Sequence, residues 1–151
     1  MTENDFRVLH SELIECYQNI EMRLKGICAA ICADEDGNWF QRLDDYELDP
    51  LGKMIQEIYA IQDRDHLDLF SSEDYQALSA LRQSRNYWVH QCFVSSDLRV
   101  VFKNGEVKRM DKAKKISEDL SDARDWEEKL TKIEHSRLKS MNRIYGVNAA
   151  F

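Results

Sequence analysis

The first 33 residues carry a stripe of apolar side chains that recur at steps of three and four. Its members are Phe6, Leu9, Leu13, Ile20, Leu24, Ile27 and Ile31. Cys16 or Tyr17 fills the single wide gap in this series. Such steps place side chains on one face of an α-helix. The stripe therefore predicts an amphipathic helix of about seven turns over residues 5–33.

Two further helices are predicted in the middle of the chain. Asp49 and Pro50 have the pattern of an N-cap followed by proline at the first helical position. That helix extends to about residue 62 through the apolar positions Leu51, Met54, Ile55, Ile58 and Ile61. Ser71 and Asp74 have capping-box spacing. They start a helix that runs to about residue 94, with the apolar positions Leu78, Leu81, Trp88 and Cys92.

Two other segments differ from these helices. The acidic stretch 33–49 predicts a solvated loop, and its glycine comes too early for the calcium-binding loop of an EF-hand. In the second segment, 98–110, apolar residues alternate with others around Asn104-Gly105. Asn-Gly between two β-prone runs favours a two-residue hairpin turn, which would set Lys103 opposite Glu106.

A last helix and the overall composition complete the prediction of the fold. The helix is expected over 112–145, with the stripe Ile116, Leu120, Ala123, Trp126, Leu130, Ile133, Leu138, Met141 and Ile144. The 151 residues include one proline and five glycines. So few helix breakers favour long helices, and the length fits one domain. We therefore predict a single domain over 1–151, an all-α, up-and-down bundle of four to five helices with a possible small hairpin at about 98–110.

Charge and cysteine usage limit the class of protein. The 28 acidic residues outnumber the 21 basic ones, for a formal net charge of −7, which excludes a general basic coat for nucleic acid. No signal-peptide pattern or membrane-length apolar run is present. The four cysteines form no CxxC pair and are expected to be reduced thiols in a core. We expect a cytoplasmic protein with no membrane, metal or cofactor.

The segment Arg85-Asn86-Tyr87-Trp88-Val89-His90 on the third long helix carries the chemistry of interest. Arg85 lies in the middle of an apolar stripe, where a guanidinium is costly to bury unless it is paired. Either the stripe faces a partner or cleft, or Arg85 pairs with a carboxylate of a neighbouring helix. Asn86 and His90 share a face, whereas Arg85 and His90 lie about 140° apart around the helix. Two copies across a two-fold axis, or a kink, would aim both at one atom.

This segment resembles the Rx4-6H motif of HEPN domains, all-helical domains of higher eukaryotes and prokaryotes. Asn86 fits the asparagine that usually follows the family's arginine. The resemblance implies a four- to five-helix bundle that dimerises so that two motifs form one cleft. It also implies metal-independent RNA cleavage by a component of a toxin–antitoxin or defence system, with an antitoxin as a possible partner. The alternative is a non-catalytic module for dimerisation or for nucleotide or protein binding.

The resemblance also assigns roles to three residues as the catalytic set. His90 would take the proton of an RNA 2′-hydroxyl or protonate the leaving 5′-oxygen. Arg85 would grip the scissile phosphate and stabilise its charge, and Asn86 would orient His90 or bind the phosphate. Cys92 stands where many toxins of the family have a tyrosine that a partner modifies with AMP, so that regulation is not expected here.

Basic residues gather after the motif helix, and they are Arg99, Lys103, Lys108, Arg109, Lys112, Lys114 and Lys115. They either track RNA phosphates or belong to a solvated hairpin and helix start. With Arg82 of the motif helix, Lys103, Lys108 and Arg109 are the candidate RNA-binding residues. Tyr87 and Trp88 are expected to pack rather than to stack on bases.

Overall fold

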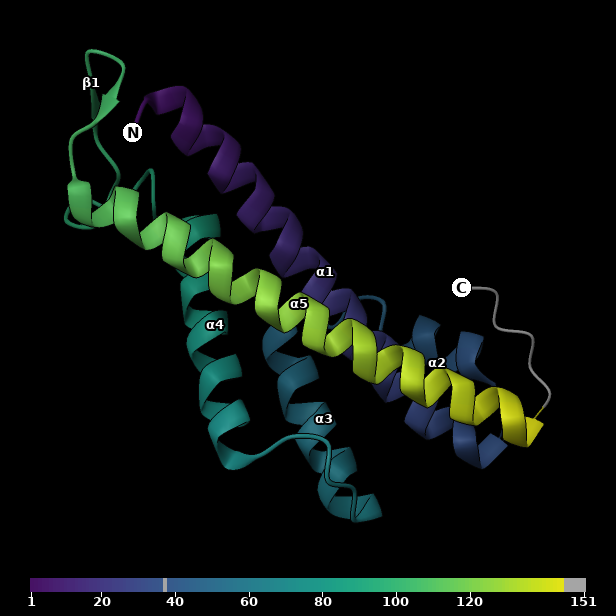
Figure 1. Cartoon of the computed structure of the whole chain (residues 1–151). Coiled ribbons are helices and arrows are strands. Elements are labelled where there is room, and N and C mark those ends of the chain that lie inside the picture. Colours follow the sequence, from purple (N-terminus) through teal and green to yellow (C-terminus); the bar gives the residue numbers. More distant parts are fainter. Residues whose placement is uncertain (37, 146–151) are drawn as a thin grey trace.

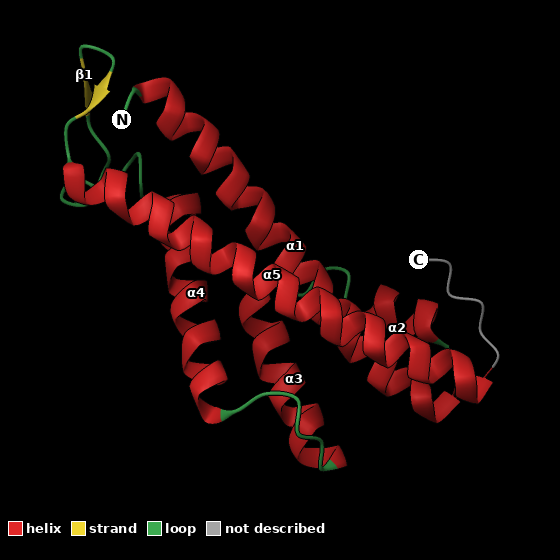
Figure 2. Cartoon of the chain, in the orientation of Figure 1, coloured by secondary structure: helices red, strands yellow, loops and turns green. Residues whose placement is uncertain are grey.

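Helices make up most of the chain, and one small hairpin interrupts them (Figures 1 and 2). The computed structural model describes residues 1–36 and 38–145, with side chains described for 1–33 and 38–140. The elements are α1 (Glu3–Asp36), α2 (Trp39–Asp45), α3 (Leu51–Asp65), α4 (Ser72–His90), β1 (Phe102–Lys103), β2 (Glu106–Val107) and α5 (Met110–Tyr145). The predicted all-α bundle with a small hairpin is confirmed.

The two longest helices, α1 and α5, lie side by side and run in the same direction (Figure 1). Arg124 of α5 bonds Glu12 of α1 at 2.8 Å. Further along both helices, Arg23 bonds Glu134 at 2.8 Å. Later residues of one helix therefore meet later residues of the other. Helices α3 and α4 form an antiparallel pair packed against this long pair.

The predicted apolar stripes form one main core, and Leu138 of α5 lies in a second, small cluster with Ala30 and Ala33 of α1. In α1 both residues proposed for the wide gap, Cys16 and Tyr17, are buried, while Leu9 is half-buried. The stripe of α3 is buried throughout, and that of α5 is buried or half-buried as far as Leu138. Its last two members, Met141 and Ile144, lie outside the described side chains. All four cysteines are free and buried, as expected for core thiols.

The loop predicted over 33–49 is wrong in part, because α2 forms within it. Asn38 caps this helix, since its side-chain oxygen accepts a hydrogen bond from the Gln41 amide at 3.1 Å. Trp39 then packs on α1 and donates its indole N–H to the Gly26 carbonyl at 3.4 Å. A helix cap and an aromatic contact with α1 therefore accompany helix formation in a segment whose composition is that of a loop.

Helix α3 begins one residue later than predicted. Pro50 is its N-cap and makes no side-chain capping bond, whereas Asp49 bonds Lys53 at 2.7 Å. The capping acceptor comes instead from α1, because the Glu21 carboxylate accepts the Leu51 N–H at 3.1 Å. A carboxylate from another helix thus takes over the role expected of Asp49.

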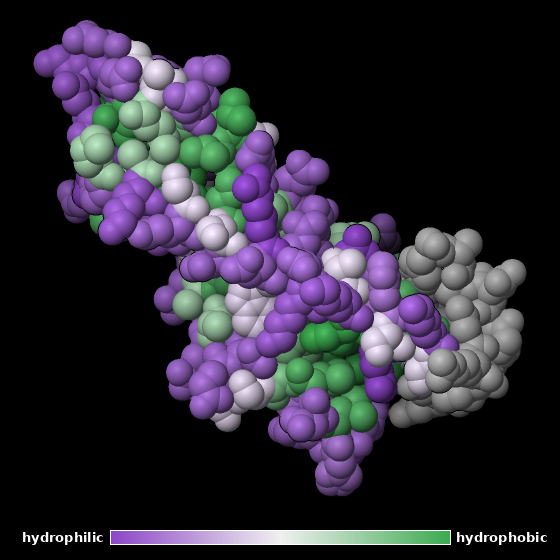
Figure 3. Space-filling model, viewed as in Figure 1, coloured by the Kyte–Doolittle hydropathy of each residue, from purple (hydrophilic) through white to green (hydrophobic). Residues whose placement is uncertain are grey.

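The surface separates hydrophilic from hydrophobic regions. Hydrophilic side chains cover the outward face of α5, and hydrophobic surface shows beneath α5 beside α3 and near the N-terminal ends of α1 and α5 (Figure 3). Across the described residues, every helix is too short or too polar to cross a bilayer.

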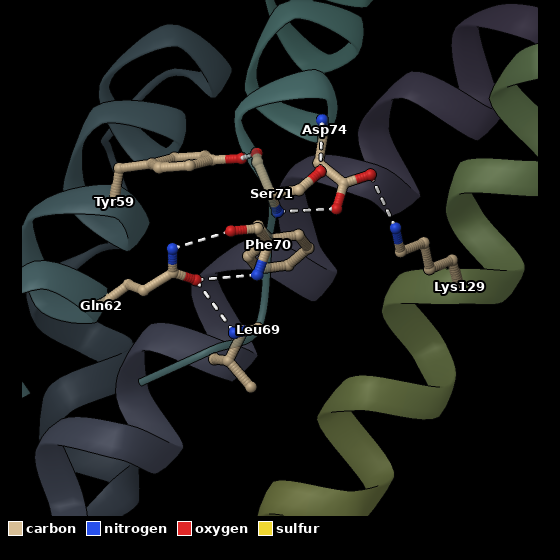
Figure 4. Close-up of polar contacts among 7 residues, drawn as sticks. All are labelled: Tyr59, Gln62, Leu69, Phe70, Ser71, Asp74 and Lys129. Carbon is tan, nitrogen blue, oxygen red and sulfur yellow. Dashed lines mark hydrogen bonds and ion pairs between the residues drawn. The ribbon is translucent and has the colours of Figure 1, made fainter. Parts of the chain in front are cut away.

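The predicted capping box at the start of α4 is confirmed (Figure 4). The Asp74 amide donates to the Ser71 hydroxyl at 3.1 Å, and the Ser71 amide donates to the Asp74 carboxylate at 2.9 Å. Lys129 of α5 bonds the same carboxylate at 2.8 Å. The N-terminus of α4 is therefore attached to α5 as well as capped.

A buried side chain, Gln62, holds the loop between α3 and α4 (Figure 4). Its amide nitrogen donates to the Phe70 carbonyl at 2.8 Å. Its oxygen accepts from the Phe70 amide at 2.8 Å and from the Leu69 amide at 3.0 Å. One side chain thus satisfies three backbone groups that the loop removes from water.

The hairpin has the predicted register, with Lys103 opposite Glu106. Its two turn residues, Asn104 and Gly105, have φ angles of 53° and 73°. Positive φ at both positions is the requirement of a type I′ turn, which Asn-Gly meets at little cost. The Glu3 amide donates to the Gly105 carbonyl at 2.8 Å, so the hairpin is attached to the start of α1.

Candidate functional site

The motif residues lie on the last two turns of α4, which ends at His90 rather than at the predicted residue 94. The amides of Gln91 and Cys92 both donate to the Tyr87 carbonyl at 2.9 Å, and the chain then leaves the helix axis. His90 is exposed, and its ring has no hydrogen-bond or ion-pair partner among the described side chains. A substrate can therefore approach this imidazole from solvent.

Arg85 is half-buried, and its guanidinium donates to the Asn86 side-chain oxygen at 3.3 Å. No carboxylate among the described side chains forms an ion pair with it, so the interpretation as a structural salt bridge finds no partner there. Asn86 is itself exposed. Arg85 and Asn86 thus form a polar pair at the surface, one helical turn before His90.

The position of α3 explains why Arg85 stays accessible. Helix α3 begins at Leu51, and a side chain added at Gly52 would lie 2.9 Å from the Arg82 Cδ atom. Arg82 is therefore opposite the first turn of α3, and Arg85, one turn further along α4, lies beyond the end of that helix. The rest of the stripe packs in the chain's own core, with Leu78 and Trp88 fully buried, so the stripe as a whole does not face a partner.

The four candidate RNA-binding residues differ in their surroundings. Arg82 is turned toward α3, and its Nε atom is enclosed without a hydrogen-bond partner. Arg109 bonds Asp111 at 3.0 Å and donates to the Asp97 carbonyl at 2.9 Å. Lys103 and Lys108 are exposed on or beside the hairpin.

The other basic residues are largely committed to partners within the chain. Lys112 is buried with its ammonium 4.4 Å from the centre of the Tyr87 ring, and burial lowers the pKa of this ammonium. Lys114 and Lys115 pair with acidic residues one turn later on α5. Of the seven basic residues, Arg109, Lys114 and Lys115 thus form ion pairs within the chain, and Arg99, Lys103 and Lys108 keep exposed positions.

Tyr87 and Trp88 pack, as predicted, rather than standing free for base stacking. Trp88 is fully buried and donates its indole N–H to the Asp119 carboxylate at 2.6 Å. Tyr87 is half-buried and donates its hydroxyl to the Leu98 carbonyl at 2.5 Å. Both side chains therefore fix the end of α4 against α5 and the turn that follows α4.

His10 is a residue that sequence reasoning left without a role. Its Nε2 atom lies 2.9 Å from the Trp88 carbonyl oxygen and 3.6 Å from the Cys92 Sγ atom. A cysteine beside a histidine is a pattern of nucleophilic catalysis, but Cys92 is buried, and burial raises the pKa of its thiol to about 11. The pair is therefore structural. Its only sequence signal is that His10 follows Phe6 by one turn on the first stripe.

Exposed apolar side chains gather at the end of α4 and in the segment that follows it. We call this set the α4-end surface, and it comprises Val89, Phe93, Val94, Leu98 and Val101. Val94 is 77% exposed. Several exposed apolar side chains so close together in the sequence make this helix end a candidate for an interaction site.

A groove of about 750 Å³ lies on another face of α4, between α4 and α5. Its lining includes Tyr17, Ser84, Asp119, Asp122, Asp125 and Trp126. Arg85, Asn86 and His90 do not line it. Three aspartates and one lysine line the groove, so its charge does not suit an RNA phosphate. The groove is therefore not part of the candidate RNA-cleavage site.

The described residues hold no group of three or more histidine, cysteine, aspartate or glutamate side chains that could bind a metal ion. Comparison of the chain with protein-family models, with curated proteins and with solved structures found no match in any of the three.

Proposed function

We propose that this protein is a metal-independent endoribonuclease of the HEPN type, a cytoplasmic toxin or defence component that acts as a homodimer. The observation that carries the proposal is the arrangement at the end of α4. There an accessible Arg85, bonded to Asn86, precedes an exposed His90 whose ring has no partner among the described side chains of this all-α bundle. These are the residue types that cleavage of RNA at its own 2′-hydroxyl requires.

The geometry of α4 supports a site shared by two copies. The helix continues through Arg85 to His90, so the two side chains diverge by about 140° around its axis. One copy does not aim both at the same phosphate. The α4-end surface adjoins His90, and burial of its apolar side chains against a second copy would stabilise a two-fold dimer. Such a dimer sets Arg85 of one copy near His90 of the other.

The proposed reaction needs only proton transfer and charge stabilisation. His90 takes the proton as the 2′-oxygen attacks phosphorus, and the bond from phosphorus to the 5′-oxygen breaks. A protonated imidazole, supplied by the second copy, returns a proton to the leaving 5′-oxygen. Arg85 stabilises the negative charge of the pentavalent phosphorane, and Asn86 holds the guanidinium in place. The products carry a 2′,3′-cyclic phosphate and a 5′-hydroxyl.

The test is an RNA-cleavage assay in EDTA with total RNA and tRNA as substrates. We expect His90→Ala and Arg85→Ala each to lower the cleavage rate by about 100-fold or more, because each removes a group that acts in the transition state. His66→Asn is the matched control. His66 is an exposed histidine with φ of 54° at the end of α3, a conformation that asparagine tolerates.

Product ends and oligomeric state decide between the outcomes. Cleavage that leaves cyclic phosphates, survives in His66→Asn and is lost in His90→Ala supports the proposal. Cleavage that persists in His90→Ala contradicts the assignment of the site. A folded wild-type dimer that cleaves neither RNA supports the alternative, a binding module built on the same surface.

A further inference from the structure

Most arginines of the chain pair with carboxylates, and two exceptions lie together on α4. Arginines that form an ion pair with an acidic side chain are Arg7, Arg23, Arg42, Arg64, Arg109 and Arg124. Among the described side chains, Arg82, Arg85 and Arg99 find no such partner. Arg99 is exposed to water, whereas Arg82 and Arg85 are half-buried. In a chain with 28 acidic and 21 basic residues, two half-buried arginines without a carboxylate need an explanation.

Arg82 and Arg85 are neighbours on one side of α4. They lie three residues apart, a spacing that brings two side chains together on a helix, where like charges repel. Within the part of the chain that the structure describes, their side chains make a single hydrogen bond, from Arg85 to the Asn86 side-chain oxygen at 3.3 Å. Two adjacent guanidinium groups without a counter-ion in the described chain favour an anionic ligand.

The Arg82 side chain lies on the first turn of α3. Gly52 leaves room for it, because a Cβ atom at this position would lie 2.9 Å from the Arg82 Cδ atom and 3.2 Å from the Nη1 atom. The Arg82 Nε atom is enclosed by protein, whereas its two terminal nitrogens bond no described atom and are open to solvent. The donors that a phosphate would use are therefore the free ones.

The acidic group at the start of α3 is already bonded elsewhere. Glu21 accepts the Leu51 N–H at 3.1 Å and pairs with Lys25 at 3.0 Å. Enclosing the Arg82 Nε atom without a hydrogen bond costs free energy, and no contact with a described residue offsets this cost. A ligand therefore explains Arg82 better than the stability of the bundle does.

We propose that Arg82 holds the RNA phosphate next to the one that Arg85 grips, so that the site binds two consecutive phosphates of one strand. This inference rests on the proposed ribonuclease. Arg85 lies between Arg82 and the end of α4 at His90. The strand therefore continues from the cleavage point along α4 toward the start of α3. Arg82 adds affinity for the substrate and does not act on the reacting atoms.

Binding of a fluorescent RNA hexanucleotide with 2′-O-methyl groups tests this proposal. The methyl groups block the attacking hydroxyl, so fluorescence anisotropy with the full chain measures binding without cleavage. We expect Arg82→Met to weaken binding about tenfold and to reduce the slope of log K against log[salt] by about 0.7, the value for one phosphate of a single strand. Arg82→Met combined with Arg85→Met should reduce the slope by about 1.4.

Two further variants separate this site from general attraction. The matched control, Arg124→Met, removes the same charge from an exposed arginine of α5 and should change the affinity by less than about twofold. Arg82→Lys keeps the charge without the planar fork, so its slope should stay near that of the wild type.

The circular dichroism melting curve separates binding of a ligand from support of the fold. Methionine fills similar space without an enclosed donor, so we expect Arg82→Met to melt at the wild-type temperature or above it. A lower melting temperature together with wild-type affinity would show that Arg82 serves the fold, and would overturn the proposal.

The proposal is also overturned if Arg82→Met keeps the wild-type slope, or if Arg124→Met loses as much affinity. It is overturned as well if ADP, whose two phosphates are directly linked, binds through Arg82 more tightly than the hexanucleotide does. A chain that binds the hexanucleotide through Arg82 but does not cleave its unmodified form would support the two-phosphate site and refute the ribonuclease.

Discussion

At the scale of single residues, Gly26 shows how a missing side chain holds α1 against α5. The Glu134 carboxylate occupies the space where a Cβ atom of residue 26 would lie. Glu134 is 4% exposed, and its burial raises the pKa of the carboxyl group, which the ion pair with Arg23 partly offsets. The close approach of the two helices therefore depends on glycine at this position.

We expect Gly26→Ala to lower the free energy of unfolding by about 3 kcal/mol, because the new methyl group displaces a buried, paired carboxylate. Gly52→Ala is the control, since its Cβ atom would meet only the movable side chain of Arg82. We expect a change within about 1 kcal/mol there. Urea unfolding of both variants measures the difference, and equal losses would show that the Glu134 contact is unimportant.

The motif and the groove differ in how far the sequence reveals them. Arg85, Asn86 and His90 lie within six residues of one helix, so their spacing alone placed Asn86 and His90 on one face. Whether these residues cleave RNA stays a prediction. The groove could not be predicted, because Tyr17, Ser84 and Asp119 come from three helices far apart in the sequence.

At the scale of elements, periodicity identified the four long helices, and turn chemistry identified the hairpin. Their ends were less predictable. Helix α4 stops at His90 without a glycine or proline to mark the end, and α3 uses Glu21 of α1 where Asp49 was expected to cap. Short helix α2 depends on Trp39 packing against α1, a tertiary contact that local composition does not contain.

The link between α3 and α4 depends on Gln62, a polar residue inside an apolar helix face. Gln62→Met keeps the length of the side chain but leaves two buried backbone groups of Phe70 and the part-buried amide of Leu69 unpaired. We expect a loss of about 2–4 kcal/mol in the free energy of unfolding. Gln56→Met, at an exposed position of the same helix, should cost little. Thermal denaturation compares the two variants. Similar melting temperatures would contradict the conclusion that Gln62 holds the loop between α3 and α4.

At the scale of the whole molecule, the α4-end surface should control self-association. Val94→Asp places a charge in the proposed dimer interface, and we expect the dimer dissociation constant to rise by about tenfold or more. Leu48→Asp is the matched control, because Leu48 is 92% exposed between α2 and α3. Sedimentation velocity measures the dimer dissociation constants of both variants. A wild-type chain that stays monomeric at high concentration, or a Val94→Asp variant that dimerises normally, would contradict the proposed interface.

The parallel pairing of α1 with α5 determines when the protein can fold during synthesis. The Arg23–Glu134 bond closes a separation of 111 residues, and the apolar face of α1 stays uncovered until the ribosome has released most of α5. Contacts between residues so far apart in the sequence slow folding, because the chain loses loop-closure entropy before burial of the core compensates for it. During synthesis α3 and α4 can pack on α1 as soon as they are made, whereas the face of α1 that meets α5 stays exposed until the last helix is complete.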